Sequence, residues 1–465
     1  MNKIHKDILD SILYSYNSYK AKEISGRWIR YNQLKQYLGN FKNSNQIEIR
    51  KIGESFEGRD IDLIKIGKGK IKVFFWSQMH GDESTSTRAI MDLLNFLNAE
   101  DENEHIRDEI LSNVTLFIIP MLNPDGAEKF NRRNSQLIDI NRDAVTQKSP
   151  EAKILYQTKL EIEPNFGFNL HDQSSGYSTG RNYKSSTISL LAPSINYKGT
   201  ITPEIETAIK LIISLKNDLD EFIPGHIARY DDEFEPRAFG DNFSKEKMCT
   251  ILIEAGGWHK DPQREYVRKI YFTTLIKALL VIADQSYSNE DPAAYKELPE
   301  NKENLFELIL RNVTINNSQN PYTIDIAIKH DDLIDLDHQQ LLTKGIVADI
   351  GDLSTFYGYE EPDMNGYQLI LPKHFENSDN KKIDIEELLH RGIAFVKHNS
   401  QNDKSWTNDA MNYYVNTKPD NNLAIDSYAN FFLAKKDKIE FAVINGFLID
   451  LTQKLEFKGN GINYD

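Results

Sequence analysis

A histidine and a glutamate, His80 and Glu83, lie three positions apart at the point where a run of apolar residues ends. Imidazole nitrogen and carboxylate oxygen are ligands that zinc takes in proteins, and a catalytic zinc site has three protein ligands and one open position. The spacing therefore indicates part of a metal site, whose third ligand must come from another segment. The alternative is an exposed turn, in which Glu83 caps a helix and His80 is solvated.

The flanking residues indicate how these two side chains are positioned. Residues 72–76, KVFFW, are mostly β-branched or aromatic and too few for a helix, so they predict a buried strand. Ser84 or Thr85 is suited to cap a following helix. Apolar residues then recur on one helical face, at Ala89, Ile90, Leu93, Leu94 and Leu97. Strand, turn and helix form half of a βαβ unit, and open parallel sheets carry their sites at the carboxyl ends of strands.

A second strand is predicted within residues 114–126, VTLFIIPMLNPDG, which end in turn-forming residues. A polar cluster follows within a short stretch and comprises Arg132, Arg133, Asn134, Asp139, Asn141 and Arg142. Two arginines and an asparagine on one rim can hold a carboxylate through charge-assisted hydrogen bonds and can stabilise a developing oxyanion. Taken alone, the cluster also fits a solvated loop with ion pairs.

A third strand is predicted within residues 163–177, where a short apolar stretch ends at His171. Beside the first motif, His171 is the missing third metal ligand, and Asp172 or Gln173 is available to orient a ligand. A histidine at the end of a strand is otherwise an ordinary rim residue.

A fourth strand, residues 248–253, stops at Glu254, just before two glycines. A carboxylate at the end of a buried strand is costly unless it is paired or used. Near a metal-activated water, Glu254 would act as the general base.

Together, the four strand ends resemble the zinc carboxypeptidase family, over about residues 24–285. The resemblance includes the segments YNQLKQYL and IGESFEGRDIDLIKIGKG, which precede the first ligands. It implies a largely parallel mixed sheet flanked by helices. By position, it also implies that His80, Glu83 and His171 hold a zinc ion.

The same resemblance assigns roles to four other residues. Arg132, in an Arg-x-Asn step, corresponds to the arginine that polarises the scissile carbonyl. Asn141 and Arg142, in DINRD, correspond to the pair that binds the terminal carboxylate of the substrate, and Glu254 corresponds to the general base. The implied activity is hydrolysis of the C-terminal amide bond of peptides by a metal-activated water.

Two other functions stay open at this point. An amidohydrolase of the aspartoacylase and desuccinylase type would use the same metal site on N-acyl amino acids, which also carry a free carboxylate. A third possibility is a binding module without catalysis. The presence of all three metal ligands and of Glu254 argues against it.

The chain departs from the family pattern in the region that closes over the substrate. Members carry a tyrosine there, about twenty residues before the catalytic glutamate, and this chain has none in that interval, Tyr230 being the nearest upstream. Either Tyr230 serves or the function is absent. Asp241, Arg237 and Glu233 are candidates to line the side-chain pocket, although a solvated loop suits each of them as well.

The amino-acid composition limits the kinds of partner that the protein is expected to bind. The chain has 465 residues, a formal net charge of -15 and no basic stripe, so nucleic acid and an anionic membrane are not expected partners. The single cysteine, Cys249, excludes an internal disulfide. Without a signal peptide or a sufficiently long apolar stretch, the sequence predicts a cytoplasmic protein. It gives no indication of an oligomeric state.

The predicted organisation is an α/β protein with a second, β-rich domain. Residues 1–285 are expected to form the catalytic domain, including N-terminal helices, and residues 286–304, polar with prolines, are expected to be a linker. Residues 305–465 contain short alternating runs that predict a β-rich accessory domain.

Overall fold

The computed structural model describes residues 3–231, 233–316, 320–335, 340–376, 383–397, 410–415, 418–420, 422–453 and 461–464. The chain divides into two units, Met1–Glu303 and Asn304–Asp465. Within the described ranges, no helix combines the length and the apolar character that crossing a bilayer requires.

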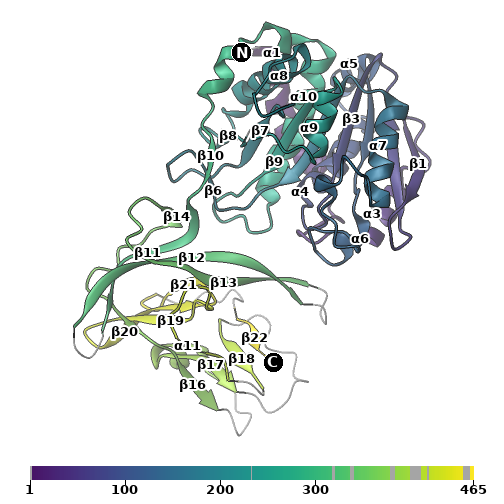
Figure 1. Ribbon diagram of the computed structural model, residues 1–465. Helices are drawn as coiled ribbons and strands as arrows, with labels where there is room; N and C mark the ends of the chain where they lie inside the picture. The colour runs from purple at the N-terminus through teal and green to yellow at the C-terminus, as the bar shows by residue number, and fades with distance from the viewer. Residues whose placement is uncertain are drawn as a thin grey trace. The chain divides into compact units, whose positions relative to one another are not determined.

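The first unit is built on an eight-stranded mixed sheet with the strand order β1-β2-β4-β3-β5-β9-β7-β8 (Figure 1). Strands β4, β3, β5 and β9 are parallel to one another. The pairs β1–β2, β2–β4 and β7–β9 are antiparallel, and the edge strand β8 is parallel to β7. The strands are β1 (Ile47–Glu54), β2 (Asp60–Ile66), β3 (Ile71–Ser77), β4 (Val114–Ile119), β5 (Phe166–Asp172), β7 (Ile188–Leu191), β8 (Ile227–Arg229) and β9 (Cys249–Ala255).

Helices cover both faces of this sheet (Figure 1). They are α1 (Lys3–Tyr14), α2 (Tyr16–Tyr19), α3 (Tyr31–Leu38), α4 (Thr85–Leu97), α5 (Glu104–Asn113), α6 (Pro124–Glu128), α7 (Pro150–Ile162), α8 (Pro203–Leu219), α9 (Phe239–Lys245) and α10 (Glu265–Ala283). Successive residues of a strand point to opposite faces. In β3, Val73 and Phe75 join the core cluster under α4, α8 and α10, whereas Phe74 and Trp76 join the one under α7 and α9.

The strand register aligns the predicted site residues at one edge. Ser77 of β3 pairs with Leu170 of β5, and His171 of β5 pairs with Glu254 of β9. The ends of these three parallel strands therefore meet, as the sequence predicted.

The stretch expected as a linker, residues 286–304, has regular structure through Glu303 and belongs to the first unit, so that prediction is wrong. It contains two 3-10 helices, η3 (Ser286–Asn289) and η4 (Pro292–Glu297), and the strand β10 (Asn301–Glu303). Strand β10 pairs antiparallel with β6 (Tyr177–Thr179), close in sequence to His171. The polar, proline-containing composition of this stretch reflects two short helices and their caps, not a flexible connection.

The second unit is β-rich, as expected from its alternating sequence. One sheet has the order β13-β12-β11-β15-β19-β20-β21, with β14 on β11, and another has the order β16-β17-β18-β22. Its elements are β11 (Leu305–Ile315), β12 (Tyr322–Asp335), β13 (Gln340–Gly351), β14 (Tyr357–Glu360), β15 (Gln368–Ile370), β16 (Lys373–Glu376), α11 (Ile385–His390), β17 (Ile393–Lys397), β18 (Asn412–Tyr414), β19 (Phe431–Lys435), β20 (Lys438–Ile444), β21 (Phe447–Asp450) and β22 (Asn463–Tyr464).

Candidate active site

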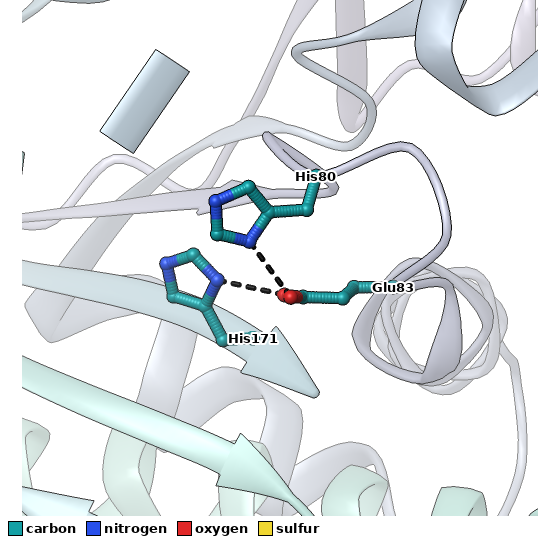
Figure 2. A group of neighbouring side chains, drawn as sticks. All are labelled: His80, Glu83 and His171. Atoms are coloured by element: carbon teal, nitrogen blue, oxygen red, sulfur yellow. Dashed lines mark hydrogen bonds and ion pairs between the residues drawn. The ribbon is translucent and has the colours of Figure 1, made fainter. Parts of the chain in front are cut away.

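Three predicted ligands converge at the carboxyl ends of β3 and β5. The two oxygens of Glu83 each contact one imidazole, at 2.7 Å from Nδ1 of His80 and 2.7 Å from Nδ1 of His171 (Figure 2). One potential ligand atom from each residue lies within 4.8 Å of the others. All three side chains are largely buried, so the group is held by its surroundings rather than by solvent.

The turn after β3 fixes this convergence. Gln78 adopts a left-handed conformation with φ 48°, and its side-chain amide donates to the carbonyl of Gly81 at 3.0 Å. Gly81 packs directly on the backbone of Gly126, where a Cβ atom would come within 2.0 Å of the Gly126 carbonyl carbon. The turn therefore requires glycine at this position. It delivers Glu83 immediately before α4, where Ser84 is the N-cap residue.

A carboxylate that was not assigned a role from the sequence, Asp139, orients the first histidine. One oxygen of Asp139 lies 3.1 Å from Nε2 of His80, and the other accepts from Nε of Arg132 at 3.1 Å. A carboxylate on Nε2 favours the proton at that nitrogen and leaves Nδ1 to bind a metal. Asp139 therefore holds both a predicted ligand and a predicted catalytic arginine.

Asp172 and Gln173 do not contact the histidines in the way the sequence suggested. The backbone N–H of Asp172 donates to Glu83 at 3.1 Å, and the Asp172 carboxylate accepts from the Thr85 hydroxyl at 2.7 Å. The Gln173 amide donates to the Ser186 carbonyl and to the Ser189 hydroxyl. These residues support the turn and the sheet edge around the ligands.

The electrostatics of the ligand group are those of a carboxylate between two imidazoles. Burial works against its ionisation, but the charges and hydrogen bonds of His80 and His171 bring the pKa of Glu83 well below its usual value. Burial lowers the pKa of His171. For His80, burial is outweighed by Glu83 and Asp139, which raise its pKa. The site thus holds an ionised carboxylate where a cation is expected.

The residues present fit a divalent metal of the zinc type. Two imidazole nitrogens and one carboxylate oxygen form a donor set that catalytic zinc sites use. The Asp139 contact on the outer nitrogen of His80 is the second interaction that metal-bound histidines usually make. Other divalent ions accept the same donors, so the geometry supports the class of ion rather than one element.

We predict that Asp139→Asn weakens metal affinity by about 10- to 100-fold, because the amide cannot orient and polarise His80 as the carboxylate does. Competition with a chromophoric zinc chelator measures this change. Asp108→Asn, on the exposed face of α5, is the matched control and should leave the affinity unaltered. Wild-type affinity in the Asp139 variant would contradict the role assigned to this carboxylate.

Glu254 lies at the end of β9, beside His171 in the sheet. It is 6% exposed, and its Oε2 is buried without a hydrogen-bond partner among the described residues. Burial, followed by the charges of Glu83 and Asp172, raises the pKa of Glu254 well above its usual value. An unpaired buried carboxyl group with a raised pKa is suited to accept and return a proton.

A cavity of about 940 Å³ connects these groups, and its wall includes every predicted site residue: His80, Glu83, Arg132, Asn141, Arg142, His171 and Glu254. Arg132 reaches the metal ligands directly, with Nη1 at 3.2 Å from Glu83 and 3.1 Å from Nδ1 of His80. The structure thus brings together residues from four separate strand ends and loops.

Asn141 and Arg142 are oriented by the segment that precedes α9. Asn141 accepts a hydrogen bond from the backbone N–H of Phe239 at 3.1 Å, so its Nδ2 faces His171, 3.4 Å from Nε2. Arg142 forms an ion pair with Glu235 through Nε at 3.1 Å and donates from Nη1 to the Asn141 carbonyl. Both donors are therefore fixed before any substrate binds.

Tyr230, the uncertain tyrosine, lines the same cavity. The charge of Glu254 is the main cause, ahead of burial, that raises the pKa of Tyr230 far above its usual value. The Tyr230 phenol therefore interacts with the charge of Glu254 and remains protonated at neutral pH. The other residues considered for the pocket differ in burial, since Asp241 is 9% exposed whereas Glu233 and Arg237 are exposed.

Sequence reasoning missed Asp139, Glu235 and Asn169 as parts of the site. Asp139 belongs to the cluster that was singled out, and its position two residues before Asn141 was the available signal. Asn169 lies two residues before His171 on β5, so strand alternation puts both side chains on one face. Glu235 carried no signal, because its contact depends on how its loop folds back on Arg142.

The chain is similar to known carboxypeptidases over part of its length. Residues 34–224 match the model of the zinc carboxypeptidase family. A segment of 136 residues is 28% identical to Carboxypeptidase SOL1 of Arabidopsis thaliana and covers 28% of each chain. A segment of 81 residues is 33% identical to Carboxypeptidase B of Astacus astacus, covering 17% of this chain and 26% of that one. The matches thus span about a quarter of these two relatives.

A solved metallo-carboxypeptidase from Burkholderia cenocepacia is also similar, at 17% identity and a TM-score of 0.45, over 55% of this chain and 69% of that one. The family model spans β4, β3, β5 and the segments that carry both histidines, Glu83 and the arginine cluster. Within its first unit, residues 34–224 of this chain are thus similar to the zinc carboxypeptidase family.

Proposed function

We propose that this protein is a metallocarboxypeptidase that removes the C-terminal residue of peptides, with zinc held by His80, Glu83 and His171. The observation that carries the proposal is the unpaired, buried carboxyl group of Glu254 beside the ligand group, in one cavity with Asn141 and Arg142. A proton acceptor, a metal-ligand group and carboxylate-binding donors are the three parts that such an exopeptidase needs.

Each residue has a distinct task in this proposal. Asn141 and Arg142 bind the free carboxylate of the substrate, and the C-terminal amide bond then lies toward the ligand group. Bound at that group, a divalent metal supplies Lewis acidity, which makes water more acidic and polarises a carbonyl oxygen.

The remaining steps belong to side chains. Glu254 takes the proton from the attacking water and delivers it to the leaving amine, and its raised pKa suits both transfers. Arg132 stabilises the negative charge that develops on the carbonyl oxygen. The Tyr230 hydroxyl, protonated at neutral pH and near Glu254, is available to hydrogen-bond the substrate.

The test is digestion of matched peptides that differ only at the C-terminus, as free acid or as amide, followed by mass spectrometry. Loss of single C-terminal residues from the free acids alone is expected. Cleavage of N-acetyl and N-succinyl amino acids, with peptides left intact, would instead favour the amidohydrolase function. Cleavage of amidated peptides at internal bonds would contradict an exopeptidase.

We predict that Arg142→Met lowers kcat/KM for free-acid peptides by about 100-fold, close to 2.7 kcal/mol, because a charge-assisted contact with the carboxylate is lost. Steady-state kinetics on one peptide measures the effect. Arg133→Met is the matched control, since Arg133 is an exposed neighbour whose guanidinium, within the described ranges, donates only to the Leu137 carbonyl. An equal loss in both variants would show that general charge, and not the Arg142 contact, matters.

A further inference from the structure

We propose that Arg264 is a positioning residue, which fixes the distance between the base Glu254 and the metal ligands. Arg264 is 7% exposed and is not among the residues that line the cavity. It therefore acts on the site through its neighbours rather than on the substrate. The inference rests on the proposed function, because it takes Glu254 as the base, and it adds a residue to which no role has been assigned.

The guanidinium of Arg264 joins the ends of the two strands that carry His171 and Glu254. Its Nη1 donates to the carbonyl of Ala255 at 2.9 Å, and its Nη2 donates to the carbonyl of Gln173 at 2.7 Å. Ala255 directly follows Glu254 on β9. Gln173 comes two residues after His171, just past the end of β5. One planar, rigid side chain thus holds two carbonyls at a set spacing.

This bridge lies where the pairing of β5 with β9 ends. The last pair of the ladder is Asp172 with Ala255, and the backbone N–H of Gln173 then donates to the Ala255 carbonyl at 2.8 Å. The next residue of the other strand, Gly256, already donates to the carbonyl of Thr187 instead, at 2.9 Å. The ends of paired segments open most easily, and here the ends carry the functional groups.

The same guanidinium reaches the group around the third ligand, Glu83. Its Nη1 lies 3.4 Å from the carboxylate of Asp172. That carboxylate accepts from the backbone N–H of Thr85 at 3.2 Å and from its hydroxyl at 2.7 Å. The backbone N–H of Asp172 donates to Glu83 at 3.1 Å. Arg264 therefore contacts neighbours of the base and of the metal ligands at once.

The start of α10 holds Arg264 in place. Its backbone is left-handed, with φ 53°, a conformation that a residue other than glycine keeps only when its surroundings impose it. Its backbone N–H donates to the carbonyl of Asp261 at 2.9 Å. The Asp261 carboxylate in turn accepts from the first backbone N–H groups of the helix, those of Glu265, Tyr266 and Val267, at 2.8, 2.9 and 3.1 Å. The guanidinium is thus presented to the strand ends from a fixed base.

Glu254 depends on such support from its backbone. Its Oε2 has no hydrogen-bond partner among the described residues, so no bond to that oxygen holds the carboxyl group in place. A displacement of about 1 Å between reacting groups can lower a rate by about 100-fold. The spacing of the ends of β5 and β9 therefore matters more for proton transfer than for substrate binding.

Arg264→Lys is the informative variant, because it keeps the positive charge and removes the planar fork that bridges two carbonyls. In zinc-loaded full-length protein, kcat on one free-acid peptide is expected to fall by about 100-fold, with KM within about threefold of wild type and the zinc content unaltered. Arg107→Lys is the matched control. Arg107 is 3% exposed and pairs with Asp101 on the distant helix α5, so this variant should keep the wild-type kcat.

A double variant separates positioning from a general structural role. If Arg264 acts by placing Glu254, then Arg264→Lys should change the residual kcat of Glu254→Gln by less than about threefold, because no base is left to place. An equal loss of kcat in both backgrounds would overturn the inference. So would a kcat within about tenfold of wild type in Arg264→Lys, or a loss of zinc from this variant.

Hydrogen exchange tests the bridge without turnover. The amide of Gln173, which donates to the Ala255 carbonyl, is expected to exchange at least about tenfold faster in Arg264→Lys than in wild type. Equal protection in the two proteins would contradict the bridge. If wild type cleaves no peptide, the proposed function fails, and the exchange rates still decide whether Arg264 holds the strand ends together.

Discussion

Replacing Glu254 by glutamine should lower kcat by about 1,000-fold or more and leave the metal content and the fold unaltered, because only proton transfer is lost. Glutamine has the same shape as glutamate and cannot act as a base at neutral pH. The expected loss lies in kcat, since we assign the carboxylate of the substrate to Asn141 and Arg142 and only proton transfer to Glu254.

The surroundings of Glu254 explain why its replacement should be tolerated by the fold. Its Oε2 has no hydrogen-bond partner among the described residues, so the amide breaks no existing bond there. The nearby charges of Glu83 and Asp172 disfavour the ionised form of Glu254 in this structure. Removing the charge should therefore leave the melting temperature equal or slightly raised.

Three measurements on one preparation check this prediction: kcat on a peptide substrate, metal content by elemental analysis, and the melting temperature. Glu102→Gln, an exposed glutamate before α5, is the matched control. Activity within tenfold of wild type in the Glu254 variant would reject Glu254 as the base. Loss of metal together with activity would show that Glu254 acts on the ligand group instead.

The sequence predicted which residues lie together where their positions follow from strand ends. His80, Glu83, His171 and Glu254 each follow a short apolar run, and parallel strands bring their carboxyl ends to one edge. Local pattern was sufficient because the register of β3, β5 and β9 is set by the same apolar residues that reveal the strands. The order of the eight strands carried no comparable local signal.

The parts that escaped prediction depend on long-range contacts. Glu235 reaches Arg142 only because its loop folds back, with the N–H of Phe239 on Asn141 and the N–H of Ala144 on the Arg237 carbonyl. Residues 286–304 read as a linker because their composition is polar, yet β10 pairs with β6 near the cavity. A polar composition indicates that a segment is exposed to water. It does not indicate that the segment lacks strand pairing.

A buried ion pair holds the N-terminal segment onto the first unit. Arg268 of α10 and Asp92 of α4 are both fully buried, and Nε of Arg268 donates to Asp92 at 2.8 Å. Asp92 also accepts from the Tyr16 hydroxyl at 2.9 Å and from the backbone N–H of Ala21 at 2.7 Å. Arg268 in turn donates to the carbonyls of Ala21 and Ile24. The two side chains thus hydrogen-bond backbone groups of Ala21 and Ile24, which lie outside the helices.

Asp92→Leu is expected to destabilise the first unit by about 3–5 kcal/mol, because the buried Arg268 guanidinium then keeps only Glu265, at 3.8 Å, as a counter-charge. Urea unfolding followed by tryptophan fluorescence suits the measurement, since Trp28, Trp76 and Trp258 all lie in the first unit. Asp108→Asn should change the free energy of unfolding by less than about 0.5 kcal/mol.

The double variant Asp92→Leu with Arg268→Met separates the charge from the contacts. Removing both charges eliminates the buried guanidinium that has lost Asp92, so this variant should be more stable than Asp92→Leu alone. It should remain less stable than wild type, because the Ala21 N–H and the two carbonyls lose their partners. A double variant no more stable than the single one would mean that these backbone contacts, and not the buried charge, determine how firmly the N-terminal segment is held.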